Sequence, residues 1–183
     1  MRSPYGAAQS VHDVLVSARS ALALAALVGL AAPARADDGC AAIGWSVKKE
    51  QGWFADKKLP HRVSGGARLR RIDRAVDLEL KPLKQAVFFL PPEKKPKADT
   101  YAGTIAFFGV PRPATYQVTL SEPAELDVFE NGMRIKPAAL MRAPKCNDAR
   151  VSGRYALQTG DLVLVQISNA ASSSIKVALE LAP

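Results

Sequence analysis

The stretch that decides the fold reads YQVTLSEPAELDVFENG and spans residues 116–132. In both halves of this stretch an apolar residue stands at every second position: Tyr116, Val118 and Leu120, then Leu126 and Val128. Strict alternation is typical of a strand with one face in the core and the other in water. Ser121-Glu122-Pro123 lies between the halves and predicts a turn. We therefore interpret residues 116–130 as a hairpin of two core strands whose acidic side chains face solvent.

Further strands are predicted on both sides of this hairpin. Asn131-Gly132 is a strong signal for a tight reversal, so residues 133–136 are expected to pair as a third strand. Alternating or short apolar runs predict strands at 75–80, 85–90, 102–110, 153–158, 162–168 and 174–181. The run at 85–90 is continuous and ends at Pro91-Pro92, which indicates a strand buried on both faces. Thr159-Gly160-Asp161 predicts a turn, and the polar segment 55–74 predicts a long loop.

These elements together predict an all-β fold. About eight short strands separated by turn residues are typical of an antiparallel β-sandwich, here jelly-roll-like, with an open barrel as the alternative. No run of helical period separates the strands, which argues against a parallel α/β sheet. The spacing of Ile43, Val47, Glu50 and Phe54 predicts one short N-terminal helix, weakened in its second half by Gly52.

The N-terminal region has the features of an export signal. Residues 20–40 read SALALAALVGLAAPARADDGC, an apolar run followed by Pro33 and by Ala34-Arg35-Ala36. This order predicts a signal peptide in residues 1–36, cleaved after Ala36, and a single domain in residues 37–183 that is periplasmic or secreted. The apolar run is shorter than the roughly 20 residues that cross a bilayer, so we expect no transmembrane anchor.

The two cysteines of the chain are Cys40 and Cys146. An even pair in an oxidising compartment is expected to form one disulfide, which here would tether the N-terminal helix. Two free thiols are the alternative reading. A redox motif is not indicated, because the two residues are far apart in sequence.

The charge is mildly basic. Removal of residues 1–36 takes away three arginines and Asp13, so the net charge falls from +8 to +6. A charge this diffuse does not indicate a nucleic-acid partner. Two basic groups could meet an anionic surface or could simply be solvated loops: Arg68, Arg70, Arg71 and Arg74, then Lys94, Lys95 and Lys97. We expect a monomer whose partner is an envelope glycan or another exported protein.

Residues 37–183 contain few side chains suited to catalysis. His61 is the one histidine there, and a single histidine cannot build a multi-histidine zinc site or a two-histidine iron site. No G-x-S-x-G stretch presents a nucleophilic serine. Two acids alone can hydrolyse a glycosidic bond, and Glu125, Asp127 and Glu130 are close in sequence. Alternate acids on a strand are more often its wet face, so we expect no catalytic residue, metal or cofactor.

The candidate ligand-binding residues are two tryptophans and a group on the central stretch: Trp45, Trp53, Asp127, Glu130 and Asn131. The tryptophans could supply an aromatic platform of the kind that sugar-binding sandwiches use, or could pack in the interior. The oxygen-bearing group could bind calcium, although its spacing matches no regular calcium loop.

Five stretches of the chain carry a resemblance to known proteins: CAAIGW, GTIAFFG, ATYQVTLSEPAELDVFENG, KCNDARVSGRYAL and SSIKVALEL. Together they resemble a group of small secreted proteobacterial β-sandwich proteins of uncharacterised function. Some members carry an automatic label of homogentisate 1,2-dioxygenase, whose iron needs two histidines and a glutamate, so His61 alone contradicts that label here. The YQVTL and ELDVFENG strands are also loosely similar to pre-peptidase C-terminal domains. The resemblance implies the fold and the two cysteines, and it transfers no catalytic residue.

The sequence therefore predicts an exported, non-catalytic binding or envelope-associated protein. The alternative is a carbohydrate-binding module or a small carboxylate-dependent hydrolase.

Overall fold

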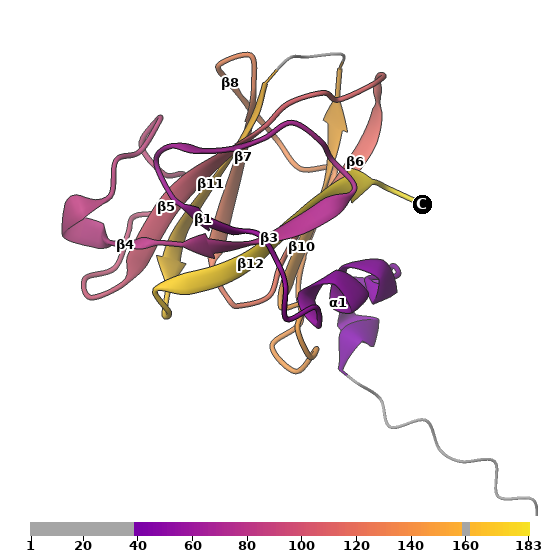
Figure 1. Cartoon of the computed structure of the whole chain (residues 1–183), viewed down its shortest axis with the longest axis horizontal. Helices are drawn as coiled ribbons and strands as arrows, with labels where there is room; N and C mark the ends of the chain where they lie inside the picture. The colour runs from indigo at the N-terminus through magenta and orange to yellow at the C-terminus, as the bar shows by residue number, and fades with distance from the viewer. Residues whose placement is uncertain (1–38, 159–161) are drawn as a thin grey trace, which may run out of the picture. The chain divides into compact units, whose positions relative to one another are not determined.

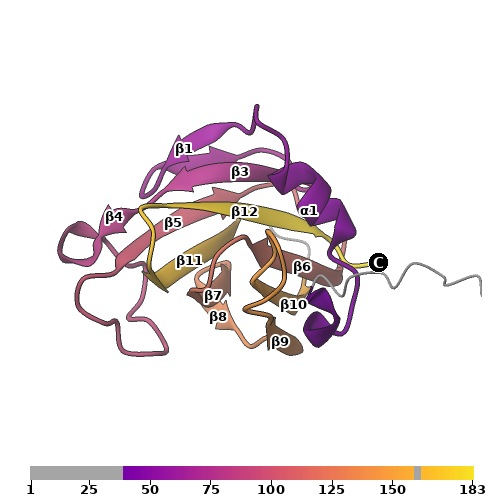
Figure 2. The same cartoon turned by 90° about the horizontal axis from the view of Figure 1, so that it is seen from below.

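Two β-sheets lie face to face and enclose a shared apolar core (Figures 1 and 2). The computed structural model describes residues 39–158 and 162–183. Sheet A has, in spatial order, β1 (His61–Val63), β3 (Arg74–Glu79), β12 (Ser174–Leu181), β6 (Ala114–Leu120), β10 (Val151–Leu157) and β9 (Ala139–Arg142). Sheet B has β2 (Ala67–Leu69), β5 (Tyr101–Phe107), β11 (Val163–Ala170), β7 (Glu125–Glu130) and β8 (Met133–Ile135), and β4 (Lys81–Pro82) pairs with β5.

The all-β sandwich expected from the sequence is confirmed, but the described residues form twelve strands rather than eight. The longer strands alternate between the sheets along the chain: β3, β6, β10 and β12 lie in sheet A, and β5, β7 and β11 in sheet B. They pair antiparallel, whereas the short edge strands β1 and β2 run parallel to β3 and β5. Because successive long strands change sheets, each contributes one apolar face to the same core.

The expected hairpin over residues 116–130 is wrong, because the turn at residues 121–123 joins the two sheets. β6 pairs with β10 and β12, whereas β7 pairs with β11 and β8. Ser121 holds the turn to sheet A: its backbone N–H donates to the Lys176 carbonyl at 3.0 Å, and its hydroxyl accepts from the Lys176 N–H at 2.9 Å. Alternation specified the buried faces of both strands, but it does not specify which strand lies alongside.

The second reversal is a hairpin, as expected. β7 pairs with β8 in the register Glu130 to Met133, and the turn between them is formed by Asn131 and Gly132. Their φ angles are 49° and 84°, the left-handed values that a two-residue turn of this kind requires.

Two further expectations about secondary structure are wrong. Residues 55–74, expected as a loop, contain β1 and β2, whose three-residue lengths give too little alternation to detect. Residues 85–90, expected as a strand buried on both faces, form no strand: a 3-10 helix (Leu83–Gln85) is followed by irregular chain. Val87 is 77% exposed and Phe89 is 50% exposed, so this apolar run was mistaken for a core element.

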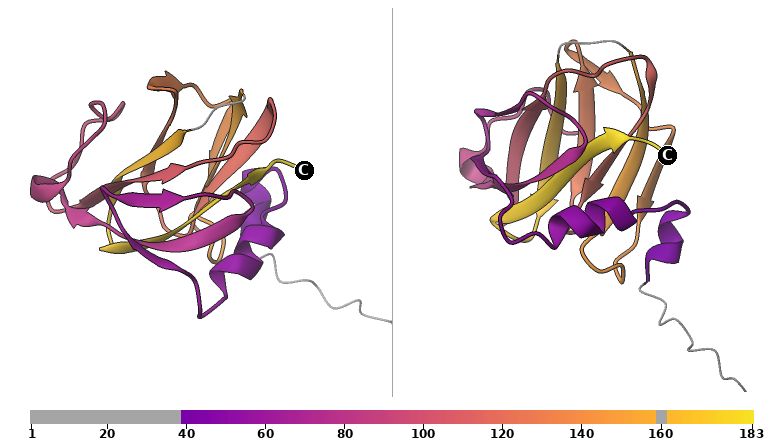
Figure 3. Two further views of the ribbon diagram at one scale, coloured as in Figure 1. Left: turned by 45° about the horizontal axis from the view of Figure 1, so that its top comes forward. Right: turned by 45° about the vertical axis from the view of Figure 1, so that its right-hand side comes forward.

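The N-terminal helix is split in two. A 3-10 turn (Cys40–Ile43) ends at Gly44, whose φ is 79°, and α1 (Lys48–Phe54) follows. α1 lies on the outer face of sheet A (Figure 3), where Phe54 packs against Ala75 and Ala178. The expected Cys40–Cys146 disulfide is confirmed, and it joins the 3-10 turn to the segment before β10.

Some sequence-based expectations lie outside the described residues. These are the signal peptide in residues 1–36, its cleavage after Ala36, and the turn at residues 159–161. Within the described residues, we find no helix with the length and apolar character needed to cross a membrane.

Candidate binding groove

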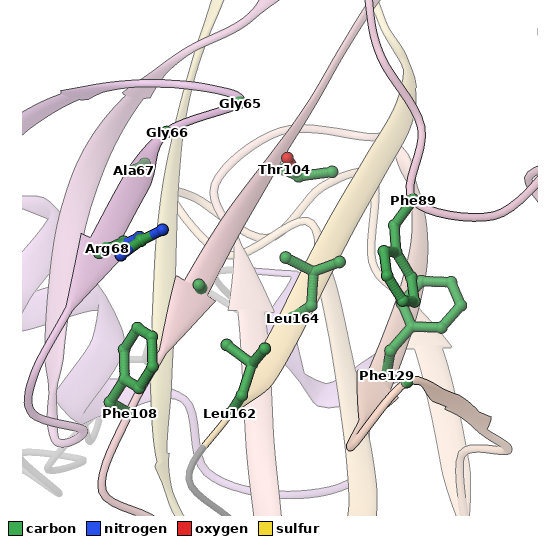
Figure 4. Close-up of a pocket in the computed structure, with 12 residues that line it drawn as sticks. Gly65, Gly66, Ala67, Arg68, Phe89, Thr104, Phe108, Phe129, Leu162 and Leu164 are labelled. Atoms are coloured by element: carbon green, nitrogen blue, oxygen red, sulfur yellow. The ribbon is translucent and has the colours of Figure 1, made fainter.

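An apolar groove of about 290 Å³ lies on the outer face of sheet B, the face turned away from the core (Figure 4). We call it the sheet B groove. Its lining is mostly carbon and comes from β5, β7, β11 and the segments beside them: Phe89, Ala106, Phe108, Phe129, Leu162 and Leu164. Gly65 and Gly66, between β1 and β2, also line the groove, on the side of Arg68 (Figure 4).

The registers of sheet B place one residue from each of five strands side by side on this face. Arg68 is the partner of Ala106, Ala106 of Leu164, Leu164 of Phe129, and Phe129 of Arg134. We call these five residues the cross-strand row. Its centre is apolar and it has an arginine at each end. Leu164 is half-buried, whereas Phe129 is 1% exposed beneath its neighbours.

The outward direction of this row follows from strand geometry. Ile105, Val128 and Val165 stand next to row residues on their strands and are fully buried in the core. Successive side chains on a strand point to opposite faces, so the row residues point outward. An outward position in a sandwich is ordinarily polar, and apolar groups on neighbouring strands there leave a patch of the kind that marks a binding surface.

The irregular segment 86–100 forms one wall of the groove by lying against the outer face of sheet B (Figure 2). Gln166 fixes it: its Oε1 accepts from the Phe89 N–H at 2.9 Å, and its Nε2 donates to the Leu90 carbonyl at 3.1 Å. The Phe89 ring meets the Phe129 ring edge to face, with centroids 5.3 Å apart. The Lys97 N–H donates to Asn169 Oδ1 at 2.7 Å farther along. We call residues 86–100 the wall segment.

Asp127, a candidate from the sequence, is a support of the wall segment. Its side chain is 6% exposed and lies at 3.4 Å from three nitrogens: Gln166 Nε2, the Glu93 N–H and Arg134 Nε. Arg134 also donates to the Pro91 carbonyl and lies over the Phe129 ring, with 5.1 Å from its Cζ to the centroid. The carboxylate therefore fixes the segment rather than facing the groove.

The opposite end of the groove is basic. A second hollow of about 400 Å³ adjoins it and is lined by Arg68, Arg70, Phe108 and Gly109, two of which also line the groove. Both arginines are exposed. Within residues 39–158 and 162–183, neither takes part in an ion pair. Figure 4 shows Arg68 on the far side of Leu164 from Phe89 and Phe129.

The two candidate tryptophans lie on sheet A, away from this groove. Trp45 is half-buried, its indole N–H donates to Ser152 Oγ at 3.0 Å, and the Arg154 guanidinium covers its ring at 4.7 Å. Trp53 is also half-buried, with Lys49 Nζ 4.8 Å from its ring centroid. Each ring therefore has a cation over one face and lies outside the sheet B groove.

The remaining candidates do not join Asp127 in a site. Glu130 is three positions from Asp127 on β7, so their side chains point to opposite faces of sheet B. Glu130 Oε1 accepts from the Gln158 N–H at 2.7 Å, and Glu130 is 5% exposed. The expectation that the acids of residues 116–130 face solvent is therefore wrong for both Asp127 and Glu130, because each carboxylate is buried against backbone N–H donors. Asn131 is the first residue of the tight turn. Within the described part of the chain, no group of three or more histidine, cysteine, aspartate or glutamate side chains could hold a metal ion.

Sequence reasoning did not find the groove. Leu164 and Phe129 occur inside segments expected as strands, where their outward direction could have been noted from the core positions next to them. Phe89 was assigned to a buried strand. Its position two residues before Pro91-Pro92 and a lysine-rich segment was the available signal that it lies in a surface loop.

A second polar cluster lies between α1 and sheet A. Glu50 is 0% exposed, and its Oε1 accepts from Gln117 Nε2 and, at 2.9 Å, from Thr119 Oγ1. Glu180 is 3% exposed and forms an ion pair of 2.7 Å with Lys49. Burial, opposed by Lys49 and reinforced by the nearby Glu50, raises the pKa of Glu180 above its ordinary value. This cluster lies under α1 and fastens the helix to the sheet.

Comparison of the chain with protein-family models, with curated proteins and with solved structures found no match. The resemblance to small secreted β-sandwich proteins therefore stays a prediction from the sequence.

Proposed function

We propose that this chain is an exported, non-catalytic binding protein and that the sheet B groove is its ligand site. One observation carries the proposal: neighbouring strands place apolar side chains outward on sheet B, where they line an open hollow. The wall segment leaves Leu164 partly exposed, and its own Phe89 is 50% exposed. An apolar side chain left in water at Leu164 does not stabilise a domain that binds nothing. An open apolar hollow with few polar groups is the ordinary form of a small-molecule site.

Export is supported by the disulfide and by the signal-like residues 1–36. A buried Cys146 bonded to Cys40 fits a compartment in which thiols oxidise. The strand order β3-β12-β6-β10 opposite β5-β11-β7-β8, with successive long strands in alternate sheets, supports the jelly-roll-like arrangement. Jelly rolls serve as binding modules in lectins.

The non-catalytic reading is supported by how the polar groups are already used. Asp127 and Glu130, the acids of the hydrolase alternative, bond to backbone N–H groups and lie on opposite faces of β7. His61 lies on β1 and faces Asp77 and Glu79, whereas Ser174 donates to Asp77 rather than to His61. A serine nucleophile needs the histidine as its base.

The carbohydrate-binding alternative has less support. Sugar sites combine an exposed aromatic platform with several hydrogen-bonding groups. The aromatic groups of the sheet B groove are phenylalanines, and its polar side chains are Arg68 and Thr104. Trp45 and Trp53 lie outside the groove, and each ring has a cation over one face.

A dye-binding experiment tests the proposal. The purified protein is titrated with an environment-sensitive apolar fluorophore, and Leu164→Gln is compared with the matched control Val63→Gln on β1 of sheet A. Val63 is 48% exposed and lines neither hollow. Burying a leucine is worth roughly 1.5 to 3 kcal/mol, so Leu164→Gln is expected to weaken binding about tenfold or more, and Val63→Gln to leave it unchanged. Equal binding by both variants would refute the site.

A further inference from the structure

We propose that the ligand of the sheet B groove is a single-chain anionic amphiphile, with its alkyl body over Leu164 and its anionic head on Arg68 and Arg70. This inference rests on the proposed function and specifies the class of ligand. The shared chemistry is a linear hydrocarbon joined to a carboxylate, sulfate or phosphate group.

The apolar part of the ligand follows from the lining. From Phe89 to Phe108 the surface is made of aromatic rings, leucines and Ala106, and the one neutral polar side chain is Thr104. A sugar or a polar peptide placed here would lose hydrogen bonds to water without replacing them. A hydrocarbon loses none and removes the exposed carbon of Phe89 and Leu164 from water.

The shape of the site favours a linear body over a compact one. The groove follows the cross-strand row, which runs perpendicular to the strands, and successive strands are about 4.8 Å apart. The wall segment lies along the Phe89 end, while the Arg68 end continues into the second hollow. A chain lying along the row therefore has one closed end and one open end.

The charge of the head follows from the arginines at the open end. Arg68 lines both hollows, and Arg70 stands two residues later on the same side, beyond the end of β2. Arg134, at the closed end of the row, is already paired with Asp127, whereas Arg68 and Arg70 have no ion-pair partner within the described residues. Guanidinium groups bind carboxylate, sulfate or phosphate oxygens with two parallel hydrogen bonds. The polarity of the site, carbon at one end and unpaired cation at the other, is complementary to an alkyl anion.

A bilayer surface is the competing source of the same chemistry. The proposal commits to the free single-chain ligand, because the apolar surface lies in a hollow between the wall segment and the β1–β2 loop. An element that binds a membrane surface buries its apolar face about 5–10 Å into the boundary between headgroups and acyl chains, which a recessed apolar surface does not reach.

The experiment is a calorimetric titration of the purified protein with monomeric hexanoate, octanoate and decanoate, and with decanol as the neutral analogue. Each added methylene buried in the groove is expected to tighten binding about fourfold. Decanoate is expected to bind at least tenfold more tightly than decanol at low salt, and raised salt is expected to reduce this difference.

Three variants separate the parts of the claim. Arg68→Gln/Arg70→Gln is expected to weaken the binding of decanoate at least tenfold and to leave the binding of decanol unchanged. Leu164→Gln is expected to weaken the binding of both decanoate and decanol. The matched control, Lys57→Gln/Lys58→Gln, removes the same charge from an exposed segment after α1. It is expected to leave the affinities for decanoate and for decanol unchanged.

The outcomes distinguish this inference from the proposed function. Equal affinity for decanol and decanoate, with no effect of the arginine substitutions, would overturn the anionic head and leave the groove as the ligand site. Decanoate binding that Leu164→Gln does not weaken would refute the groove itself. Binding to vesicles of anionic phospholipid without binding of monomeric decanoate would also overturn the inference.

Discussion

Removal of the disulfide should destabilise the fold without changing its topology. The Cys40–Cys146 bond closes a loop with a sequence separation of 106 residues. For a loop of that length the chain-entropy model gives a stabilisation of about 4 to 5 kcal/mol, because the crosslink restricts the unfolded chain. Cys146 is also 0% exposed and packs with Ile43, Val47 and Ala149, so replacement by alanine removes some packing as well.

The assay is equilibrium unfolding in urea, comparing the oxidised protein with Cys40→Ala/Cys146→Ala. The expected result is a loss of about 4 to 5 kcal/mol with the near-ultraviolet spectrum of the core retained below the transition. The reduced wild-type protein is the matched control, since it lacks the bond but keeps both sulfurs. A loss below about 1 kcal/mol in both would show that the N-terminal segment is held without the crosslink and would refute the reasoning.

Three further outcomes are expected. Glu180→Gln should reduce the pH dependence of stability, because burial and the nearby Glu50 raise the pKa of Glu180 in the folded state. The contribution of Glu180 to the free energy of unfolding is therefore fully present at low pH and falls as pH rises through the folded-state pKa. The difference between wild-type and variant urea unfolding curves across pH measures this contribution. Tyr155→Phe should raise stability by roughly 1 kcal/mol, because the buried Tyr155 hydroxyl has no hydrogen-bond partner within residues 39–158 and 162–183; a lower melting temperature would contradict this. Gln166→Leu should speed hydrogen exchange at the Phe89 amide while the amides of β6 stay protected, and unchanged exchange at Phe89 would show that Gln166 does not hold the wall segment.

Alternation predicts which apolar side chains face the core, because it is a local property, but it does not predict that Gln117, Thr119 and Asp127 on the other face are buried too. Tyr116, Val118 and Leu120 are all fully buried, as are most apolar positions of β11 and β12. The partner of each strand is a non-local property. A turn such as Ser121-Glu122-Pro123 can reverse the chain within one sheet or carry it to the opposite sheet, and the residue pattern is the same in both cases.

The candidate groove could not be predicted in the same way, because it is assembled from five distant parts of the chain. Arg68, Phe89, Ala106, Phe129 and Leu164 meet only through the registers of sheet B and the path of the wall segment. The same limit explains the tryptophans. Trp45 and Trp53 suggested an aromatic platform, whereas the structure pairs one ring with Arg154 and the other with Lys49.

The central claim is that ligand binds to the outer face of sheet B, and chemical-shift mapping by nuclear magnetic resonance tests it most directly. The purified protein, labelled with ¹³C at methyl groups and ¹⁵N at amides, is titrated with decanoate. The predicted result is that the largest shifts fall on the Leu164 and Leu162 methyl groups and on the Ala106 methyl group, while the Trp45 indole N–H on sheet A does not move. Shifts centred on Trp45 and Trp53, with Leu164 unchanged, would contradict the account.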